Sequence, residues 1–377
     1  MRVVPTDAAL HFVGAATWEA LSGQTVQTGV FADVPAVPHV TIGQRADLVL
    51  VAPATADLLA RAAHGLADDL LTSTLLTARC PVLMAPAMHT EMWEHPATRS
   101  NVATLRERGT LVLEPASGRL TGADTGPGRL PEPDDLLAAA DAVLSQPRLT
   151  RDMGGRRVLV TAGSTREPLD PVRYLTNQSS GRQGWALARV AALRGAEVTL
   201  VAGDSELVAP SGVTTMRVST AREMQVVVEQ LMPGMDAVVM AAAVADHRPV
   251  AEADTKIKKD PGGAGTSLEL VPNPDILAGV VTSARDDQVV VGFAAETGDD
   301  SGTVVELGRR KLAAKGCDLL VVNEVGGGKA FGRADNEAVV LAADGTSVEV
   351  PLTSKEHLAV VVWDEVVSRL PGTLRRT

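Results

Sequence analysis

The chain has 377 residues, of which 45% are hydrophobic and only 2% aromatic, and its formal net charge is −11. This length favours two or three domains, the negative charge argues against a general binder of nucleic-acid backbones, and the scarcity of aromatic rings argues against stacking platforms for single strands. The chain has no apolar run of ~20 residues and no signal sequence, which argues against a membrane span and against export. Its two cysteines, Cys80 and Cys317, are far apart and are expected to be reduced core residues. The sequence therefore predicts a cytoplasmic protein.

Strand-like and helical segments alternate from end to end, which predicts an α/β protein built on parallel sheets. In the first part, strands are expected at 48–52, 82–85 and 111–113, and helices at 56–64, 68–78, 97–108 and 134–144. The polar segment 145–156 contains a Pro and a Gly pair and lacks apolar periodicity. It is the expected linker between two domains.

The alternation restarts after this linker, which predicts a second, Rossmann-like doubly wound domain. Strands are expected at 158–160, 198–201, 237–241, 289–293 and 319–322, with helices at 181–194, 221–231 and 304–315. A hairpin of strands 338–342 and 348–350 follows. Thr353 and Glu356 are expected to form the capping box of a last helix that ends near residue 370. Three methionines of this half are expected to pack in its core, namely Met224, Met232 and Met235.

Lysine is scarce in this chain, and its placement is uneven. Only seven of the 35 Lys and Arg residues are lysines, and the first of them is Lys256, followed at once by Lys258 and Lys259. An ammonium is a compact point charge suited to a phosphate or a developing oxyanion, although a solvated charged turn is the alternative. Lys311 and Lys315 lie on one face of a predicted helix. These five lysines are therefore candidates to surround one polyanion, such as a triphosphate that carries Mg²⁺.

Three further segments follow strands of the second half. Residues 161–168 lie where a doubly wound sheet binds nucleotides, although they lack the GxGxxG fingerprint. Residues 177–181 precede a helix whose N–H groups suit a phosphate, but an ordinary N-cap explains them equally well. The small residues 241–245 let a base or sugar approach the backbone, and Asp246 can accept from an amino group or hold a metal–phosphate.

The segments TREPLDPVRYLTNQSSGRQG, AAAVADHRP, KIKK, NPDILAG and GFAAET occur in this order. Together they make residues 155–377 resemble the phosphopantothenate–cysteine ligase domain of bacterial coenzyme A biosynthesis. The resemblance implies that CTP converts the carboxylate of 4'-phosphopantothenate into an acyl-cytidylate with loss of pyrophosphate, and that the amine of L-cysteine then displaces CMP. By the same resemblance, Asn177 handles the acyl-cytidylate and Lys256 supports its formation.

The resemblance also implies the contacts of both substrates. The CTP contacts are Ala241, Ala242, Asp246, Lys256, Pro274, Asp275, Ile276, Leu277, Phe293, Lys311 and Lys315. The other implied substrate contacts of this half are Ser179, Ser180, Gly181, Lys258 and Lys259. Transfer of a cytidylyl group needs positive charge where the α-phosphate becomes more negative, so the lysines agree with this chemistry.

The first half contains APATAD, PAMHTEMW and a Gly-rich stretch at 117–129. These make residues 1–147 resemble phosphopantothenoylcysteine decarboxylase, a flavodoxin-like, homo-oligomeric FMN protein that is commonly fused ahead of the ligase. The resemblance implies that FMN oxidises the cysteinyl thiol, that CO₂ leaves, and that the resulting ene-thiol is reduced. The implied residues are the catalytic His39 and Thr121, the flavin contacts Pro53, Ala54, Thr55 and Met88, and the substrate contacts His89 and Met92.

The first half departs from this family at three places. Residues 2–6 read as the family's second strand, so about 30 residues, one strand–loop–helix unit with the phosphate-binding loop, are expected to be missing. Either the start was misassigned or the domain is vestigial. Thr121 stands where the substrate clamp usually has a proton-donating Cys, and a hydroxyl is a poorer acid. His89 replaces the amide of the usual PAMN segment.

Three hypotheses follow. The first is a bifunctional ligase–decarboxylase, the second a ligase whose flavodoxin-like half serves assembly, and the third a flavin-free regulatory module. The lysines and Asn177 argue against the third. The expected partners are 4'-phosphopantothenate, L-cysteine and CTP, with FMN and Mg²⁺ as cofactors, and with no nucleic acid or membrane. The resemblance further implies a homo-oligomer, a dimer for the ligase and a trimer-based assembly for the decarboxylase.

Overall fold

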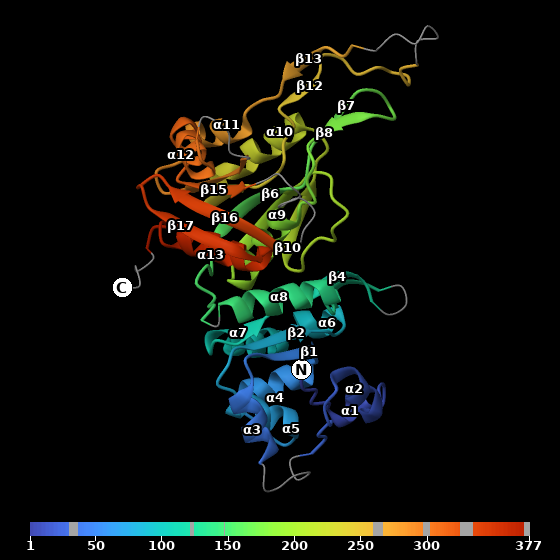
Figure 1. Cartoon of the computed structure of the whole chain (residues 1–377). Helices are drawn as coiled ribbons and strands as arrows, with labels where there is room; N and C mark the ends of the chain where they lie inside the picture. Colours follow the sequence, from blue (N-terminus) through green and yellow to red (C-terminus); the bar gives the residue numbers. More distant parts are fainter. Residues whose placement is uncertain are drawn as a thin grey trace. The chain divides into compact units, whose positions relative to one another are not determined.

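The computed structural model of the chain describes residues 1–29, 37–120, 124–146, 148–258, 267–296, 302–324 and 335–372. It divides into two compact units, Met1–Arg151 and Asp152–Thr377 (Figure 1). No helix within the described ranges is long and apolar enough to cross a membrane.

The first unit is built on a parallel sheet in the order β1-β2-β3. The strands are β1 (Val49–Ala54), β2 (Val82–Pro86) and β3 (Leu111–Val112), and an antiparallel hairpin of β4 (Ala116–Arg119) and β5 (Thr125–Arg129) follows. The helices are α1 (Asp7–Leu10), α2 (Ala15–Ser22), α3 (Pro38–Arg45), α4 (Ala56–His64), α5 (Leu70–Thr77), α6 (Thr90–Glu94), α7 (Pro96–Glu107) and α8 (Pro133–Ser145). Side chains of the three strands and of α4, α6 and α7 form its core, which includes the buried Leu59, Met84 and Trp93.

Two expectations for the first unit were wrong. Residues 2–6 form no strand, because an extended segment becomes a strand only where its backbone pairs with a neighbour, and the described sheet contains β1, β2 and β3 alone. The side chain of Thr6 instead caps α1 by accepting a hydrogen bond from Ala9 N. Cys80 was expected to be buried but is partly exposed, whereas Cys317 is buried, and both are free thiols.

The second unit contains an eight-stranded sheet in the order β10-β9-β6-β11-β14-β15-β16-β17. The strands from β10 to β15 run parallel, whereas β16 and β17 are antiparallel to their neighbours. Their bounds are β6 (Arg157–Ala162), β9 (Glu197–Ala202), β10 (Val213–Arg217), β11 (Ala237–Met240), β14 (Val289–Glu296), β15 (Leu319–Glu324), β16 (Asp335–Ala342) and β17 (Ser347–Ser354). The strands β7 (Arg166–Pro168) with β8 (Tyr174–Thr176), and β12 (His247–Pro249) with β13 (Leu270–Pro272), form two hairpins that extend beyond the sheet (Figure 1).

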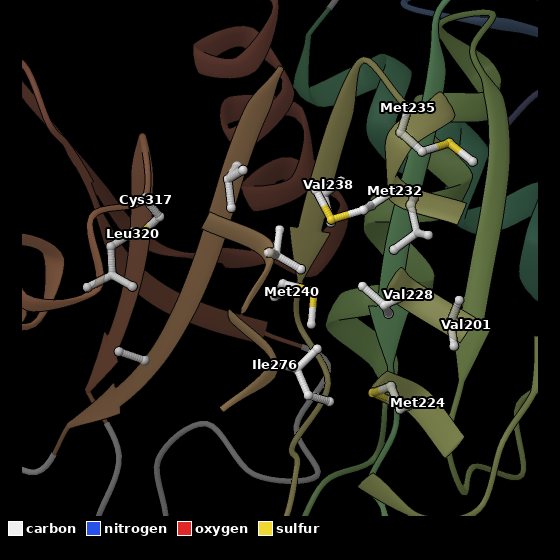
Figure 2. Close-up of a cluster of buried hydrophobic side chains, with 14 of the residues drawn as sticks. Val201, Met224, Val228, Met232, Met235, Val238, Met240, Ile276, Cys317 and Leu320 are labelled. Atoms are coloured by element: carbon white, nitrogen blue, oxygen red, sulfur yellow. The ribbon is translucent and has the colours of Figure 1, made fainter. Parts of the chain in front are cut away.

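Helices cover both faces of the large sheet. On one face, α9 (Arg182–Leu193) packs against α13 (Lys355–Val367), and on the other lie α10 (Ala221–Leu231), α11 (Ile276–Ser283) and α12 (Val304–Lys315). A short 3₁₀ turn, η2 (Met232–Gly234), follows α10. Met224, Met232 and Met235 belong to the hydrophobic cluster between the sheet and α10 to α12 (Figure 2), which confirms the packing role predicted for them.

One predicted helix cap was wrong. Ser354, rather than Thr353, is the N-cap of α13, and its side chain accepts a hydrogen bond from His357 N. The reason is that β17 continues to Ser354, with Thr353 paired to Asn336 in the ladder. The strand therefore holds Thr353, and the helix starts one residue later than the predicted capping box would place it.

Candidate functional site

The parallel strands of the second unit bring several predicted residues to one edge. β11 lies between β6 and β14, so the segments that follow these three strands leave the sheet at its carboxyl edge. In sheets of this kind, ligands bind in the crevice outside that edge. Residues 163–168 follow β6, residues 241–246 follow β11, and Glu296 ends β14.

The segment 241–246 is fixed by two threonine side chains, one near the end of β6 and one in the loop that follows it. Ala242 N donates to Thr161 Oγ1 at 3.1 Å, and Ala245 N donates to Thr165 Oγ1 at 3.0 Å. Both threonines are fully buried. Because buried hydrogen bonds are costly to break, the backbone of this segment is held rigidly, and its side chains are small. Asp246 at the end of the segment is exposed.

Two carboxamides hold the same segment from outside. Asn177 Nδ2 donates to Val244 O at 2.9 Å, and Asn273 Nδ2 donates to Ala245 O at 2.8 Å. Asn273 N also donates to Asp246 O. The structure therefore brings the predicted residues Asn177, Asp246 and the 241–242 pair to one place. Asn273 was absent from the predicted site residues, although the Asn-Pro-Asp sequence that precedes α11 was the signal for it.

Residues 179–181 form the loop before α9. Gly181 is the N-cap of this twelve-residue helix, with φ 75° and no side-chain cap. Gly181 N donates to Ser179 Oγ, and the Ser180 carbonyl accepts from Ser205 Oγ. The first-turn N–H groups of α9 thus lack the side-chain cap that an ordinary Ser or Asn N-cap would provide, which leaves a suitable terminus for an anion.

Two of the predicted lysines are paired with carboxylates. Lys311 Nζ lies 3.1 Å from Glu296 Oε1, and Lys315 forms an ion pair with Asp275, the N-cap residue of α11. Burial alone would raise the pKa of Asp275, but hydrogen bonds from Lys315 and from Ala278 N lower it below the usual value. The two ammonium charges of Lys311 and Lys315 are therefore already neutralised by carboxylates.

The other three predicted site lysines are not paired in this way in the described part of the chain. Lys256 and Lys258 are exposed, and neither forms an ion pair within the described ranges, while Lys259 lies outside the described residues. Of the remaining predicted nucleotide contacts, Pro274, Leu277 and Phe293 are half-buried. Ile276 packs in the hydrophobic core, so only its backbone is available to a ligand.

In the first unit, the predicted flavin contacts lie at the carboxyl ends of β1 and β2. Ala54 O accepts a hydrogen bond from Ala87 N at 3.2 Å, which joins the end of β1 to the segment before Met88. Thr55 is the N-cap of α4, with its hydroxyl oxygen accepting from Leu58 N. Pro53 is exposed and follows a cis peptide bond.

The Gly-rich stretch, expected to be a loop, is the β4–β5 hairpin, and it lies against residues 88–90. Met88 N donates to Gly128 O at 2.9 Å. A Cβ atom at Gly128 would overlap Met88 O, and one at Gly126 would overlap Thr90 Oγ1. Only glycine permits this close approach, which explains the composition of the stretch. Thr121 lies outside the described residues.

The predicted histidines lie on different elements. His39 is in the first turn of α3, where its carbonyl accepts from Thr77 Oγ1 of α5 at 2.6 Å, and its Nδ1 atom is buried without a hydrogen-bond partner among the described residues. Thr90 Oγ1 is likewise buried and unpaired there. His89 and Met92 are exposed at α6. In the described part of the chain, His39 is therefore hydrogen-bonded to α5, and no hydrogen bond joins it to residues 86–90.

Comparisons with known proteins cover both units. The family model described as "DNA/pantothenate metabolism flavoprotein C-terminal domain" matches residues 153–370, and the model described as "Flavoprotein" matches residues 1–145. The chain is 59% identical over 379 residues to the coenzyme A biosynthesis bifunctional protein CoaBC of Mycobacterium tuberculosis strain H37Rv, with 99% of this chain and 90% of that protein covered. It is 42% identical over 365 residues to CoaBC of Vibrio cholerae, with 96% and 89% covered. A crystal structure of the C-terminal domain of CoaBC is 35% identical, with a TM-score of 0.48, and the match covers 58% of this chain and 96% of that one.

Proposed function

Because the chain belongs to the family of bifunctional CoaBC proteins of coenzyme A biosynthesis, which ligate phosphopantothenate to cysteine and decarboxylate the product, we propose that its ligase uses CTP at the carboxyl edge of the large sheet. A carboxylate oxygen of 4'-phosphopantothenate attacks the α-phosphorus of CTP, and the bond to the departing pyrophosphate breaks. The amine of L-cysteine then attacks the acyl carbon, loses a proton, and releases CMP.

The observation that carries this proposal is the convergence on residues 241–246. Thr161 of β6 and Thr165 of the following loop accept hydrogen bonds from this segment, and Asn177 and Asn273 donate to it from other loops. Its small side chains leave room for a base or sugar beside a fixed backbone. The Asn177 carboxamide bonds through its Nδ2 atom, so its Oδ1 atom is the group directed to the acyl-cytidylate or to the incoming amine.

The proposed roles of the lysines depend on whether each one already forms an ion pair with a carboxylate. Lys311 and Lys315 are balanced by Glu296 and Asp275 before nucleotide binds, so the phosphates of CTP compete with those carboxylates for them. Lys256 has no such competitor in the described part of the chain and supplies uncompensated charge at the α-phosphate. Mg²⁺ accompanies the nucleotide, because this ion usually binds through substrate phosphates.

The phosphate of 4'-phosphopantothenate is proposed to bind at the N-terminus of α9. Gly181 leaves the first-turn N–H groups without a side-chain cap, and the hydroxyl groups of Ser179 and Ser180 lie on the same loop. A helix of this length also presents the positive end of its dipole to an anion. Lys258 and Lys259 are proposed to add positive charge to this substrate's site.

For the first unit we propose FMN, in keeping with the matched Flavoprotein family. The residues present fit such a group, since Thr90 Oγ1, two residues after Met88, is a buried polar atom without a partner in the described chain, and a group of this kind calls for a partner that the chain itself does not supply. When bound, FMN supplies the two-electron oxidation of the cysteinyl thiol. Pro53, Ala54, Thr55 and Met88 would line the flavin, and the hairpin that carries Thr121 would cover the substrate.

A homo-oligomer is part of the proposal. The two projecting hairpins of the second unit carry the exposed apolar side chains Val172, Tyr174, Val250, Leu268 and Leu270 along or beside their strands. Apolar groups gathered on a projecting hairpin suit a contact between ligase copies.

Release of pyrophosphate tests the nucleotide assignment. The full chain would be incubated with 4'-phosphopantothenate, Mg²⁺ and one of CTP, ATP, GTP or UTP, without cysteine. We expect pyrophosphate with CTP, and CMP plus phosphopantothenoylcysteine once L-cysteine is added. Equal rates with ATP, or no pyrophosphate with any nucleotide, would contradict the proposal.

A further inference from the structure

The turn between β7 and β8 is organised around one buried carboxylate. Asp170 is 3% exposed. Its Oδ1 atom accepts hydrogen bonds from the backbone N–H groups of Val172 and Arg173, each at 2.9 Å. Its Oδ2 atom accepts from Arg173 Nε at 3.0 Å and from Arg173 Nη2 at 2.6 Å. These bonds close the turn on itself, and the hydrogen bond from Arg173 in particular lowers the pKa of Asp170, so the carboxylate is charged at neutral pH.

The same pair also holds the lysine segment. Ile257 N donates to Asp170 Oδ2 at 3.1 Å, and Ile257 O accepts from Arg173 Nη2 at 2.9 Å. Both polar groups of one residue, 87 positions away from Asp170 along the chain, are thus bound by a single Asp–Arg pair. Ala253 N donates to Leu169 O at 3.0 Å, which ties the segment to the turn at a second point.

The residue held in this way lies between two exposed lysines, Lys256 and Lys258. A lysine ammonium sits at the end of a flexible stem, so the position of its charge depends on where the backbone is fixed. The turn that fixes it leads through β8 directly to Asn177, which is anchored to Val244 O. One hairpin therefore sets the position of the lysine relative to the carboxamide.

We propose that Asp170 and Arg173 act as positioning residues for the ligase, forming a latch on Ile257 that places Lys256 for formation of the acyl-nucleotide. This inference rests on the proposed function, because it takes the role of Lys256 from there. The pair binds both polar groups of Ile257, the residue next to that lysine, so it fixes the backbone from which the Lys256 side chain extends. Displacement of a charge by about 1 Å costs on the order of a hundredfold in rate, so a latch of this kind matters for turnover.

The test is Asp170→Asn in the full chain. The carbonyl oxygen of Asn can still accept from Val172 N and Arg173 N, whereas its NH₂ group replaces the oxygen that accepts from Arg173 Nη2 and Ile257 N. The turn is kept and the hydrogen bond from Ile257 N is lost, while Arg173 loses the carboxylate oxygen that orients it toward Ile257 O. Asp344→Asn is the matched control, because Asp344 also caps a turn, at Thr346 N, and pairs with an arginine, Arg369. It lies after β16, next to the amino end of β15 and therefore at the opposite edge of the sheet.

Two readouts are needed, hydrogen exchange of residues 253–258 and pyrophosphate release with CTP and 4'-phosphopantothenate. For Asp170→Asn we expect faster exchange in that segment and a kcat lowered about tenfold or more, with the KM for CTP changed about threefold at most. The control should match the parent in both, and both variants should have similar melting temperatures.

Each other outcome has a distinct meaning. Unchanged exchange would show that the latch does not hold the segment, and faster exchange with unchanged kcat would show that holding it is irrelevant to the reaction. Either result overturns the inference. If the parent itself releases no pyrophosphate from CTP, the proposed function fails instead, while the exchange data still decide whether the latch exists.

Discussion

The two units build their proposed sites by different means. In the second unit, loops that are distant in sequence are joined by hydrogen bonds between side chains and backbone, as at Asn177 with Val244 and Asp170 with Ile257. In the first unit, the β4–β5 hairpin approaches residues 88–90 so closely that only glycine fits, and two buried polar atoms have no partner in the described chain. The second site should therefore be sensitive to the loss of a single charge or hydrogen bond, and the first to the addition of a single methyl group.

The largest effect should come from Lys256→Gln. This change removes the uncompensated charge proposed to act at the α-phosphate, and the loss of such a preorganised group costs on the order of a hundredfold or more. Pyrophosphate release with CTP should be abolished, whereas CO₂ release from supplied phosphopantothenoylcysteine should match the parent. A parallel fall in both activities would show that the two units do not work independently, and would contradict the view that each unit has its own site.

Asn177→Asp should separate the two halves of the ligase reaction. The new carboxylate cannot donate to Val244 O and repels both this carbonyl oxygen and the acyl-cytidylate, so amide formation should fall about tenfold to a hundredfold. Pyrophosphate release in the absence of cysteine should continue. Gln178→Glu, which adds the same charge at the neighbouring exposed residue, is the control. Equal amide formation in the parent and the Asp variant would remove Asn177 from the mechanism.

Gly128→Ala tests the first unit. The added Cβ would overlap Met88 O at a residue with φ 155°, and the hairpin would have to move away from residues 88–90. Decarboxylation should fall about tenfold, since misplacement of a covering segment costs alignment, while CTP-dependent pyrophosphate release stays unchanged. Gly118→Ala controls for backbone strain, because Gly118 has φ 149° but a Cβ there would meet only the flexible side chain of Arg129. Equal losses in both variants would attribute the effect to strain rather than to the overlap.

The smallest effect concerns the paired lysines. Lys315→Met removes the partner of Asp275, a half-exposed pair of a type that usually stabilises a protein by about 0.2–1 kcal/mol. Because Lys315 lowers the folded-state pKa of Asp275, this stabilisation is present above the unfolded value of about 3.9 and is lost as pH falls through the folded value. Urea unfolding of parent and variant should therefore differ at pH 7 and converge in acid. A difference that persists in acid would have another source.

Local signals in the sequence determined much of the fold. The bounds of α4, α10 and α12 agree with the predicted helices, because Thr55, Thr220 and Thr303 cap them and apolar periodicity continues to their ends. The strands of the large sheet were also predicted, apart from β10, since buried parallel strands appear as runs of Val, Leu and Ala. Most residues that carry the proposed ligase chemistry were identifiable as well, because they belong to short motifs, whereas Lys311 and Lys315 were identified by their spacing on one helix face.

Only the tertiary structure decided how these motifs meet. The ion pairs of Lys311 and Lys315, the support of residues 241–246 by Thr161 and Thr165, and the contact of Asp170 with Ile257 depend on the order and register of strands in the sheet. A side chain's own segment contains no information about a partner tens of residues away. Such a partner becomes fixed only when folding brings the carboxyl ends of β6, β11 and β14 to the same edge.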